Sequence, residues 1–518
     1  MPALRIVLVF CTLLLPLLMQ GQQQRDSVLN RVITVNASNL PVTVILDKIT
    51  SGYGIFFSYD ALLIDNEQRI TLQAENLTVE EVLRELFRGD QYRFLGKNNH
   101  IIISDREEGT AIHPRDTLKN KPYFEISGKI RDQETGEALS YVSISLADRP
   151  VGTISNADGN FLLKLPLEDK RDTVIVSTVG YARMKKLAGE FRKEEVIDLQ
   201  PVSVKIREIK VKAVSVTEIL GNFREKIREN YASGNQLLTG FYRETLKQDE
   251  EYINVSEAVL EILKAPYDAI SRNDKVHLLK ARKSPEVRPF HWVNFKLQGG
   301  PRTIIMLDVV KTMETFLDPG FADYYHYSVQ QVIWYKNHPV YVIRFRPVKG
   351  ANIPCFEGEI YIEKESYALL YARFALDDAG LELTGQSFII KKPGGFRVKP
   401  LFVRYQIDFS EFEGLWHLHT AHASIAFKVR SRNDRVNSVF HSVSDLLVTE
   451  VDQTDLKRFP VKDLFSVNDI FAEFTQDYDE DFWENYNIIE PDEDLQLAIR
   501  RFSPSADRKK EMNEQIKP

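Results

Sequence analysis

The sequence predicts a multidomain, mainly β protein with three folded parts: an α+β N-terminal domain built from a β-α-β repeat, a β-sandwich, and a large antiparallel β-sheet domain, half-barrel-like, with flanking helices. Three observations support this prediction. A strand–helix–strand pattern occurs twice within residues 30–105, apolar and polar residues alternate within residues 124–165, and β-rich runs joined by short turns dominate from residue 237 onward. A length of 518 residues, at roughly 100 to 200 per domain, accommodates all three parts.

The N-terminal part is an internal repeat. Residues 35–59 read as strand, helix and strand, and residues 72–95 repeat that order. In the second copy Thr78 precedes Glu81 by three residues, which predicts a capping box at the start of the helix. This repeat resembles the short N-terminal domain shared by secretins and TonB-dependent receptors. The resemblance implies a periplasmic domain that contacts another envelope protein, an anti-sigma regulator or a TonB-type protein, through residues 30–105; the alternative is a tethered spacer.

The second part has the alternation of strands with one buried face. Apolar residues recur at Ile126, Ile130, Val142, Ile144 and Leu146. Turn-forming residues 132–136 and 156–159 lie between these runs. Through these turns and residues 152–161 the stretch resembles the carboxypeptidase-regulatory-like module, a transthyretin-type β-sandwich, which implies a fold without catalytic residues. We interpret Asp132 and Asp158 as turn formers, because the carboxylate-rich loop that Ca²⁺ needs is absent.

The third part begins with a helix and continues as strands. Residues 217–231 carry apolar side chains at helical spacing, which predicts an amphipathic helix. The predicted strands are 238–246, 252–263, 325–335, 340–345, 358–362, 368–376, 381–390, 398–409, 415–429 and 437–449. Short turns such as residues 412–414 predict an antiparallel meander. The many aromatic residues here indicate either core packing or a cavity that suits a glycan, peptide or lipid ligand.

Two weaker resemblances concern this third part. Residues 241–244, 252–258 and 482–488 look like recurrent signatures of uncharacterised envelope proteins that carry the regulatory-like module, and they imply no established activity. The strand pattern is also similar to curved half-barrels that carry lipids or lipoproteins. A TonB-dependent receptor would need a barrel of about 22 strands, and residues 237–449 are too few for that. We therefore expect a receptor-like front end without the barrel.

The N-terminal residues predict export from the cytoplasm. Arg5 precedes an apolar run at residues 6–19, followed by polar residues, which is typical of a secretory signal peptide. No other run is long and apolar enough to cross a membrane, so we expect no transmembrane helix in the mature chain and a location in the periplasm or at the periplasmic face of the outer membrane. The net charge of -7 argues against a nucleic-acid partner.

The predicted segments are 1–21 signal peptide, 30–105 N-terminal domain, 106–121 linker, 122–203 sandwich, 216–462 antiparallel β domain and 463–518 acidic helical tail.

Motifs for catalysis are missing. None of the ten histidines begins a His-Glu-x-x-His motif, and residues 385–387 lack the second glycine of a nucleophile elbow. We expect no cofactor, and His417 and His419, alternating on one predicted strand, are only weak metal candidates without a third ligand. Glu244, Glu257 and Glu261 could act as general acids or bases, but a sequence this rich in glutamate contains many such carboxylate pairs by chance. Cys355 is expected to be a buried, inert thiol.

The leading hypothesis is a non-enzymatic, exported envelope protein that docks to an envelope partner through its N-terminal domain. Its C-terminal β domain would bind a lipid, glycan or peptide ligand, or a partner protein. The first alternative is a periplasmic carrier or assembly factor for lipid or outer-membrane components, which predicts a continuous apolar cavity in the third part. The second alternative is a hydrolase with an unrecognised site, which predicts titratable side chains that converge in a pocket.

Overall fold

The computed structural model describes residues 28–59, 69–87, 92–97, 100–105, 122–202, 215–269, 272–283, 296–297, 300–384, 389–391, 395–431, 436–459, 464–465, 471, 476–477, 483 and 486–502. The chain forms two compact units, residues 1–114 with 460–464 and residues 115–459 with 465–518. The predicted signal peptide and linker, and most of the predicted tail, lie outside the described residues. No helix within the described ranges has the length and apolar composition needed to cross a membrane.

The first unit contains the predicted strand–helix–strand order twice. Its elements are a 3₁₀ turn (Val28–Asn30), β1 (Val32–Pro41), α2 (Val42–Tyr53), β2 (Phe56–Tyr59), β3 (Arg69–Thr78), α3 (Val79–Leu86), β4 (Tyr92–Lys97) and β5 (His100–Asp105). β1 pairs with β3 in an antiparallel sheet, and β2, β5 and β4 form a second sheet. The helices pack their apolar faces into one core with both sheets; Ile45, Ile49 and Val82 are fully buried there.

The capping box predicted at the start of α3 is confirmed. The Thr78 hydroxyl accepts a hydrogen bond from the Glu81 N–H at 3.3 Å, and the Glu81 carboxylate accepts one from the Thr78 N–H at 2.8 Å. These bonds to Thr78 lower the pKa of Glu81. The reciprocal pair satisfies two N–H groups that would otherwise lack partners at the start of the helix.

The second unit begins with a β-sandwich. Its strands are β6 (Tyr123–Asp132), β7 (Ser143–Leu146), β8 (Gly152–Ile154), β9 (Asn160–Pro166), β10 (Thr173–Ser177), β11 (Met184–Leu187) and β12 (Glu195–Leu199). They form two sheets, ordered β11-β10-β7-β8 and β12-β6-β9, around one apolar core. Asp132 forms a turn as predicted, because its carboxylate accepts hydrogen bonds from the N–H groups of Glu134 and Thr135 at 2.7 and 2.8 Å.

The large sheet follows. Its elements are α4 (Val216–Glu225), α5 (Ile227–Asn230), β13 (Gln236–Gln248), β14 (Glu251–Lys264), β15 (Lys275–Lys283), β16 (Lys296–Leu297), α6 (Pro301–Ile305), α7 (Val309–Thr312), a 3₁₀ helix (Pro319–Tyr324), β17 (Tyr325–Tyr335), β18 (His338–Pro347), β19 (Phe356–Glu363), β20 (Leu369–Leu376), α8 (Asp378–Thr384), β21 (Ile389–Lys391), β22 (Arg397–Phe412), β23 (Leu415–Ser431), β24 (Val436–Gln453), β25 (Gln476–Asp477) and α9 (Glu493–Phe502).

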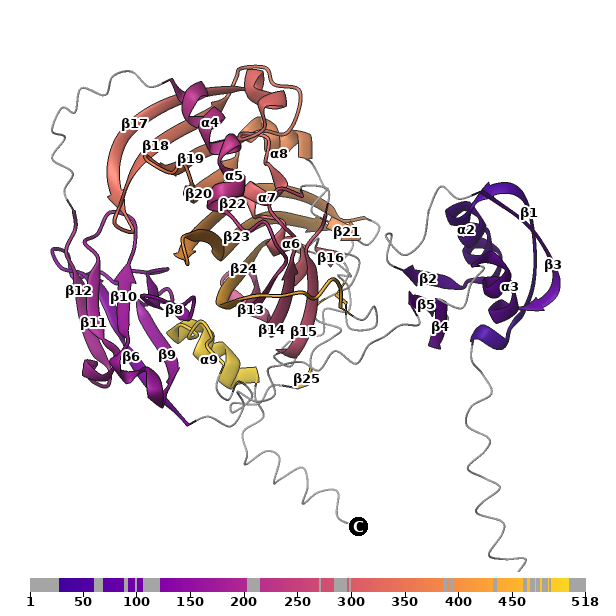
Figure 1. Cartoon of the computed structure of the whole chain (residues 1–518), viewed down its shortest axis with the longest axis horizontal. Coiled ribbons are helices and arrows are strands. Elements are labelled where there is room, and N and C mark those ends of the chain that lie inside the picture. The colour runs from indigo at the N-terminus through magenta and orange to yellow at the C-terminus, as the bar shows by residue number, and fades with distance from the viewer. Residues whose placement is uncertain are drawn as a thin grey trace, which may run out of the picture. The chain divides into compact units, whose positions relative to one another are not determined.

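The topology of this sheet is not a single meander. The eleven strands are ordered β17-β18-β19-β20-β22-β23-β24-β13-β14-β15-β25 (Figure 1). The stretch from β17 to β24 is a meander, but the earlier hairpin of β13 and β14 pairs with β24, the last strand of that run. All pairs are antiparallel except the short contact of β15 with β25. Local turns determine neighbouring hairpins, whereas the β24–β13 pair depends on contacts between residues about 200 positions apart.

One predicted strand is wrong. Residues 381–384 belong to helix α8, where the sequence had predicted a strand over 381–390. The Asp377 side chain accepts a hydrogen bond from the Gly380 N–H at 2.7 Å, and the Asp377 carbonyl accepts one from the Leu381 N–H at 2.9 Å. These bonds start a helical turn at a point where apolar alternation alone suggested an extended chain.

The two faces of the large sheet differ. Helices α4 to α7 lie across one face (Figure 1), where they enclose an aromatic core. Phe223, Tyr231, Phe316, Phe345 and Phe409 are almost fully buried in it. On this face the sheet and helices are packed together by large side chains. Most residues that line the three cavities described below belong to the other face.

The sandwich and the C-terminal segment contact that other face. The Ser143 hydroxyl lies 3.2 Å from the His419 imidazole, and the Thr153 hydroxyl donates to the Ile488 carbonyl at 3.0 Å. The Asn487 side chain accepts from the Lys164 N–H at 2.7 Å and donates to the Lys164 carbonyl at 3.1 Å. The sandwich is therefore joined to the sheet both directly and through the C-terminal segment.

Candidate functional site

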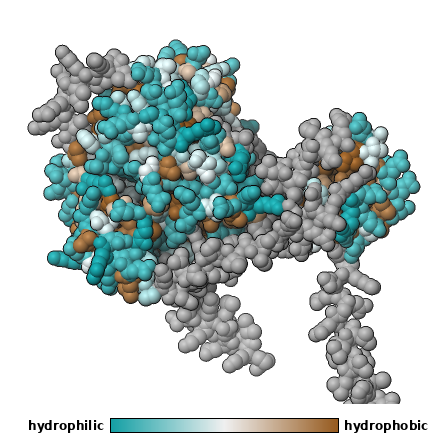
Figure 2. Space-filling view, viewed as in Figure 1, coloured by the Kyte–Doolittle hydropathy of each residue, from teal (hydrophilic) through white to brown (hydrophobic). Residues whose placement is uncertain are grey.

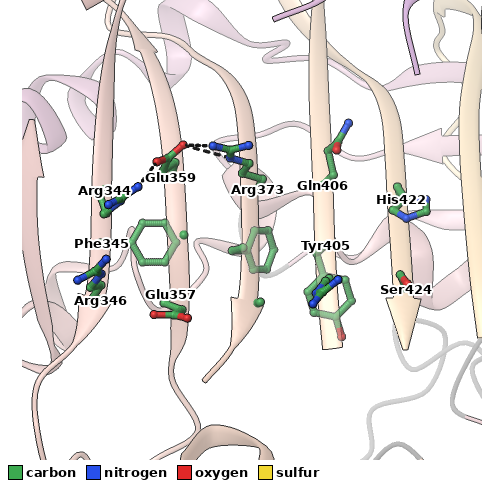
Figure 3. A pocket seen from close by; sticks show the side chains of 14 residues that line it. Arg344, Phe345, Arg346, Glu357, Glu359, Arg373, Tyr405, Gln406, His422 and Ser424 are labelled. Atoms are coloured by element: carbon green, nitrogen blue, oxygen red, sulfur yellow. Dashed lines mark hydrogen bonds and ion pairs between the residues drawn. The ribbon is translucent and has the colours of Figure 1, made fainter. Parts of the chain in front are cut away.

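A row of charged and polar side chains crosses the face of the large sheet that the helices leave free. Directly paired positions on neighbouring strands give the row Arg344, Glu359, Arg373, Gln406, His422, Asp445, Arg243, Glu257 and Arg282. Because side chains directly opposite each other in a sheet share a face, strands β18 to β15 present these residues together. Figure 3 shows the exposed end of this cross-strand row.

At the exposed end, two arginines share one carboxylate. Glu359 accepts from Arg344 at 2.9 Å and from Arg373 at 2.6 Å (Figure 3). Burial by itself would raise the pKa of Glu359, but the two guanidinium groups outweigh this and lower it. Both arginine side chains stay open to solvent, with 42% and 57% of their area exposed. They retain N–H groups that can bind a further anion, because a guanidinium carries five donors.

These residues line a cavity of about 530 Å³, here called the arginine groove. Four guanidinium groups face it, from Arg344, Arg346, Arg373 and Arg404. Only two carboxylates line it, those of Glu357 and Glu359, so the groove carries an excess of positive charge in a chain with a net charge of -7. Among the described residues, no carboxylate lies within ion-pair distance of Arg346 or Arg404. The groove is therefore suited to a negatively charged group.

At the other end, the row repeats the arginine–glutamate–arginine arrangement in a buried form. Glu257 accepts from Arg243 at 2.7 Å and from Arg282 at 2.9 Å. The C-terminal segment covers this triad: Arg243 donates to the Ile489 carbonyl at 2.6 Å, and the Arg282 guanidinium lies 4.6 Å from the Trp483 ring. The three signature segments of the sequence thus meet here, because Arg243, Glu257 and Trp483 come from one segment each.

The middle of the row lines a second cavity, of about 280 Å³, here called the histidine cavity. His422 pairs with Asp445 at 2.7 Å, and the Ser424 hydroxyl lies 2.8 Å from the His441 imidazole. Burial, helped by the nearby Lys247 and His422, lowers the pKa of His441 and favours its neutral form. His422 and Ser424 come from β23, and His441 and Asp445 come from β24. No spacing in the sequence indicated that these four polar groups converge.

A third cavity, of about 260 Å³, lies where the sandwich meets the sheet, and we call it the hydroxyl cavity because most of its lining side chains carry a hydroxyl group. Arg373 and Gln406 line both this cavity and the arginine groove. His422 and Ser424 likewise line both the arginine groove and the histidine cavity. Tyr141 of the sandwich lines the hydroxyl and histidine cavities. The three cavities are therefore neighbouring parts of one polar surface.

The two histidines considered as metal ligands have separate partners. His417 lies 3.2 Å from the Gln236 side chain, and His419 contacts Ser143. Burial lowers the pKa of each to about 4, so both are neutral at neutral pH. The predicted alternation breaks at His419, because Asp408 pairs with Thr420 and Phe409 pairs with Leu418 in a β-bulge. In the part of the chain that the structure describes, no group of three or more His, Cys, Asp or Glu side chains is arranged to hold a metal ion.

The other sequence candidates lie away from the three cavities. Glu244 is half-buried on the helix side and accepts from the Tyr242 hydroxyl at 2.8 Å and the Gly300 N–H at 3.1 Å. Glu261 pairs with His277 at 3.1 Å. Cys355 is buried, as expected, and burial raises the pKa of its thiol, which keeps it protonated and unreactive.

The burial of Glu244 predicts a pH-dependent stability difference. Burial raises the pKa of Glu244. Ionisation of this group therefore destabilises the folded state progressively as the pH rises from the ordinary glutamate pKa through the raised one. We expect Glu244→Gln to be more stable than the wild type at pH 8, with the difference shrinking towards pH 4. Urea unfolding at the two pH values measures this, and a difference that grows on acidification would contradict it.

Residues 126–211 match the family described as CarboxypepD_reg-like domain, which confirms the resemblance of the sandwich. The match extends from β6 past β12, and its last residues lie outside the described part. No curated protein matched the sequence.

Three solved structures show weak likeness to the chain. A putative outer membrane lipoprotein-sorting protein domain from Vibrio parahaemolyticus is 12% identical, with 46% of this chain and 94% of that one covered at a TM-score of 0.21. A LolA superfamily protein from Nitrosomonas europaea is 10% identical, with 47% of this chain and 96% of that one covered at a TM-score of 0.22. A DUF1329 family protein from Desulfovibrio piger is 10% identical, with 47% of this chain and 95% of that one covered at a TM-score of 0.21. Scores this low establish neither a shared fold nor a shared function.

Proposed function

We propose that this protein is a non-enzymatic, exported envelope protein whose large sheet binds a negatively charged polar ligand in the arginine groove. The observation that supports it is the excess of guanidinium groups over carboxylates in a cavity of about 530 Å³. This volume falls within the roughly 300–1,000 Å³ of typical ligand sites. Arg346 and Arg404 keep their donors free for a ligand, because neither is neutralised by a carboxylate among the described residues.

The face of the second unit seen in Figure 2 is mostly hydrophilic, with apolar residues in small separate patches. The predicted apolar cavity of a lipid carrier would need space between the sheet and its helices, where the aromatic core is packed. The carrier alternative therefore draws less support from this geometry than the binding of a polar ligand on the opposite face.

One observation favours the hydrolase alternative. His422, His441, Asp445 and Ser424 converge on the histidine cavity, and the Ser424 and His441 pair has the distance of a nucleophile and its base. Ser424, however, is paired with Arg404 on one side and Val443 on the other, in the middle of the sheet. Its neighbouring backbone N–H groups are engaged in the ladder and do not form an oxyanion hole. The geometry therefore supports a binding site better than a hydrolase active site.

The N-terminal unit completes the proposal. Residues 30–105 would dock to an envelope partner of the anti-sigma or TonB type, as the sequence resemblance implies. Its described core is self-contained, with buried residues contributed by both helices and by strands of both sheets. A folded module of this kind can present a surface to a partner while the second unit binds its ligand.

Calorimetric titration tests the proposed ligand class. The probes are a hyaluronan tetrasaccharide, tetraglutamate and tripolyphosphate, each titrated into the full chain at low salt. We expect at least one probe to bind, and Arg346→Gln with Arg404→Gln together to weaken it by about tenfold or more, because each charged hydrogen bond contributes roughly 1.5–3 kcal/mol. Arg397→Gln, an exposed arginine of β22 outside the groove, serves as the control. Binding that the double variant leaves unchanged would refute the groove as the site.

A further inference from the structure

The hydroxyl cavity is chemically distinct from the arginine groove beside it. Nine of the thirteen residues that line it are serine, threonine or tyrosine. Ser143 and Ser177 come from the sandwich, whereas Tyr361, Tyr371 and Thr420 come from three strands of the large sheet. Side-chain hydroxyls both donate and accept hydrogen bonds, so this lining matches a ligand that also does both.

Tyr371 supplies one of the lining hydroxyls that bond to no described residue. Tyr371 is only 8% exposed, and within the described residues its hydroxyl makes no hydrogen bond. Its neighbours are engaged, since the Tyr335 hydroxyl donates to Asp408 and the Tyr361 hydroxyl reaches Glu359 at 3.4 Å. This hydroxyl lines the cavity, so its donor and acceptor are available to a ligand group there.

A buried donor without a partner lies in the adjoining histidine cavity. The side-chain amide nitrogen of Asn156 is buried without a hydrogen-bond partner, and Asn156 is 5% exposed. Tyr141 lines both cavities and so connects the two positions. The Tyr371 hydroxyl and the Asn156 amide thus both offer a donor that no described residue accepts, along one surface next to the positively charged groove.

We propose that the hydroxyl cavity is a subsite for a neutral sugar unit, and that the ligand of this protein is an acidic oligosaccharide whose carboxylate lies in the arginine groove. This inference rests on the proposed function and specifies its ligand. A sugar ring offers several hydroxyls that match the lining, whereas a peptide backbone offers one donor and one acceptor per residue. The cavity of about 260 Å³ lies just below the roughly 300–1,000 Å³ of whole ligand sites, which suits a single ring.

The neighbouring positions of the two cavities place the acidic and the neutral sugar units of the ligand side by side. Arg373 and Gln406 line both the arginine groove and the hydroxyl cavity. A carboxylate that reaches Arg373 from the groove therefore lies beside a unit in the hydroxyl cavity. An oligosaccharide in which acidic and neutral units alternate fits this arrangement, and a hyaluronan tetrasaccharide is a defined probe of that kind.

Titration of the full chain tests the inference. We expect the hyaluronan tetrasaccharide to bind at least about tenfold more tightly than tetraglutamate. Tyr371→Phe removes only the unpartnered hydroxyl, so we expect it to weaken binding of the tetrasaccharide about three- to tenfold, as one neutral hydrogen bond would, and to leave any tetraglutamate binding unchanged. Tyr341→Phe is the control, because Tyr341 is a buried tyrosine on the helix side of the sheet.

The outcomes separate this inference from the proposed function. If the arginine variants weaken anion binding while Tyr371→Phe has no effect, the groove binds anions and the sugar subsite is refuted, leaving the hydroxyl cavity to water. Equal affinity for tetraglutamate and the tetrasaccharide also refutes it. If no anionic probe binds at all, both proposals fail.

Discussion

Replacing Glu257 by glutamine is expected to lower the free energy of unfolding by about 3–5 kcal/mol, the cost of leaving buried charges unpaired. The Arg243, Glu257 and Arg282 side chains are only 6%, 1% and 3% exposed. Removal of the single carboxylate leaves two guanidinium groups together beneath Trp483 and Ile489. Urea unfolding followed by tryptophan fluorescence measures the loss, since all four tryptophans lie between residues 292 and 483.

The chain contains its own control for this experiment. Glu359 binds Arg344 and Arg373 in the same arrangement on the same row, but both arginines are largely exposed. Ion pairs with an exposed partner contribute about 0–1 kcal/mol, so Glu359→Gln should reduce the stability much less than Glu257→Gln does, although Glu359 itself is 8% exposed. Equal losses in the two variants would show that covering by the C-terminal segment does not matter, and would contradict the prediction.

Strong acidification should destabilise the wild type as Glu257→Gln does, because protonation also removes the charge of Glu257. Burial would raise the pKa of Glu257, but Arg243 and Arg282 outweigh it and lower the pKa. The stabilisation from this triad is therefore complete above the ordinary glutamate pKa, and it is lost as the pH falls through the lowered value. The stability difference between the wild type and Glu257→Gln should shrink at strongly acidic pH.

The second large effect is expected on the helix side of the sheet. Lys264 is buried between Asp274 at 2.8 Å and Asp308 at 2.5 Å, and Asp308 also accepts from the Tyr267 hydroxyl at 2.8 Å and caps α7 through the Lys311 N–H. Asp308→Asn keeps the size and capping ability of the side chain but removes its charge. We expect a loss of about 3–5 kcal/mol, because the ammonium group keeps only one of its two carboxylates in a buried site.

Asp318→Asn is the matched variant for this prediction. Asp318 caps a 3₁₀ helix through the Gly320 N–H, without a recorded cation partner in the described structure. Asparagine caps nearly as well as aspartate, so a small change is expected. The test compares the urea concentrations at which the wild type and the two variants are half unfolded at pH 7. A large loss in Asp318→Asn, or none in Asp308→Asn, would mean that capping and not the buried charge determines the stability here.

The pH dependence of the Lys264 cluster has the opposite sign. Burial would lower the pKa of Lys264, but Asp274 and Asp308 together raise it. The stabilisation from this cluster is therefore complete below the ordinary lysine pKa and is lost as the pH rises through the raised value. The wild type should lose stability relative to Asp308→Asn only at strongly alkaline pH.

The sequence by itself determined the local elements. Period-two alternation predicted the strands of the sandwich, and the Thr78 and Glu81 spacing predicted the cap of α3, because both signals depend on residues close together in the chain. The exception, α8, also has a local cause, since the Asp377 side chain starts a helix that alternation does not reveal. Alternation further indicated which residues of each strand share a face.

Only the tertiary structure decided which strands lie side by side, and with them the candidate site. Arg373, Gln406 and His422 become neighbours because β20, β22 and β23 pair in one register, which follows from contacts along whole strands. The sequence marked Arg243, Glu257 and Trp483 as parts of three signatures, but not that they meet. Pairing of distant strands is set by the summed burial of many side chains, so no local pattern in the sequence encodes the cavity between the sandwich and the sheet.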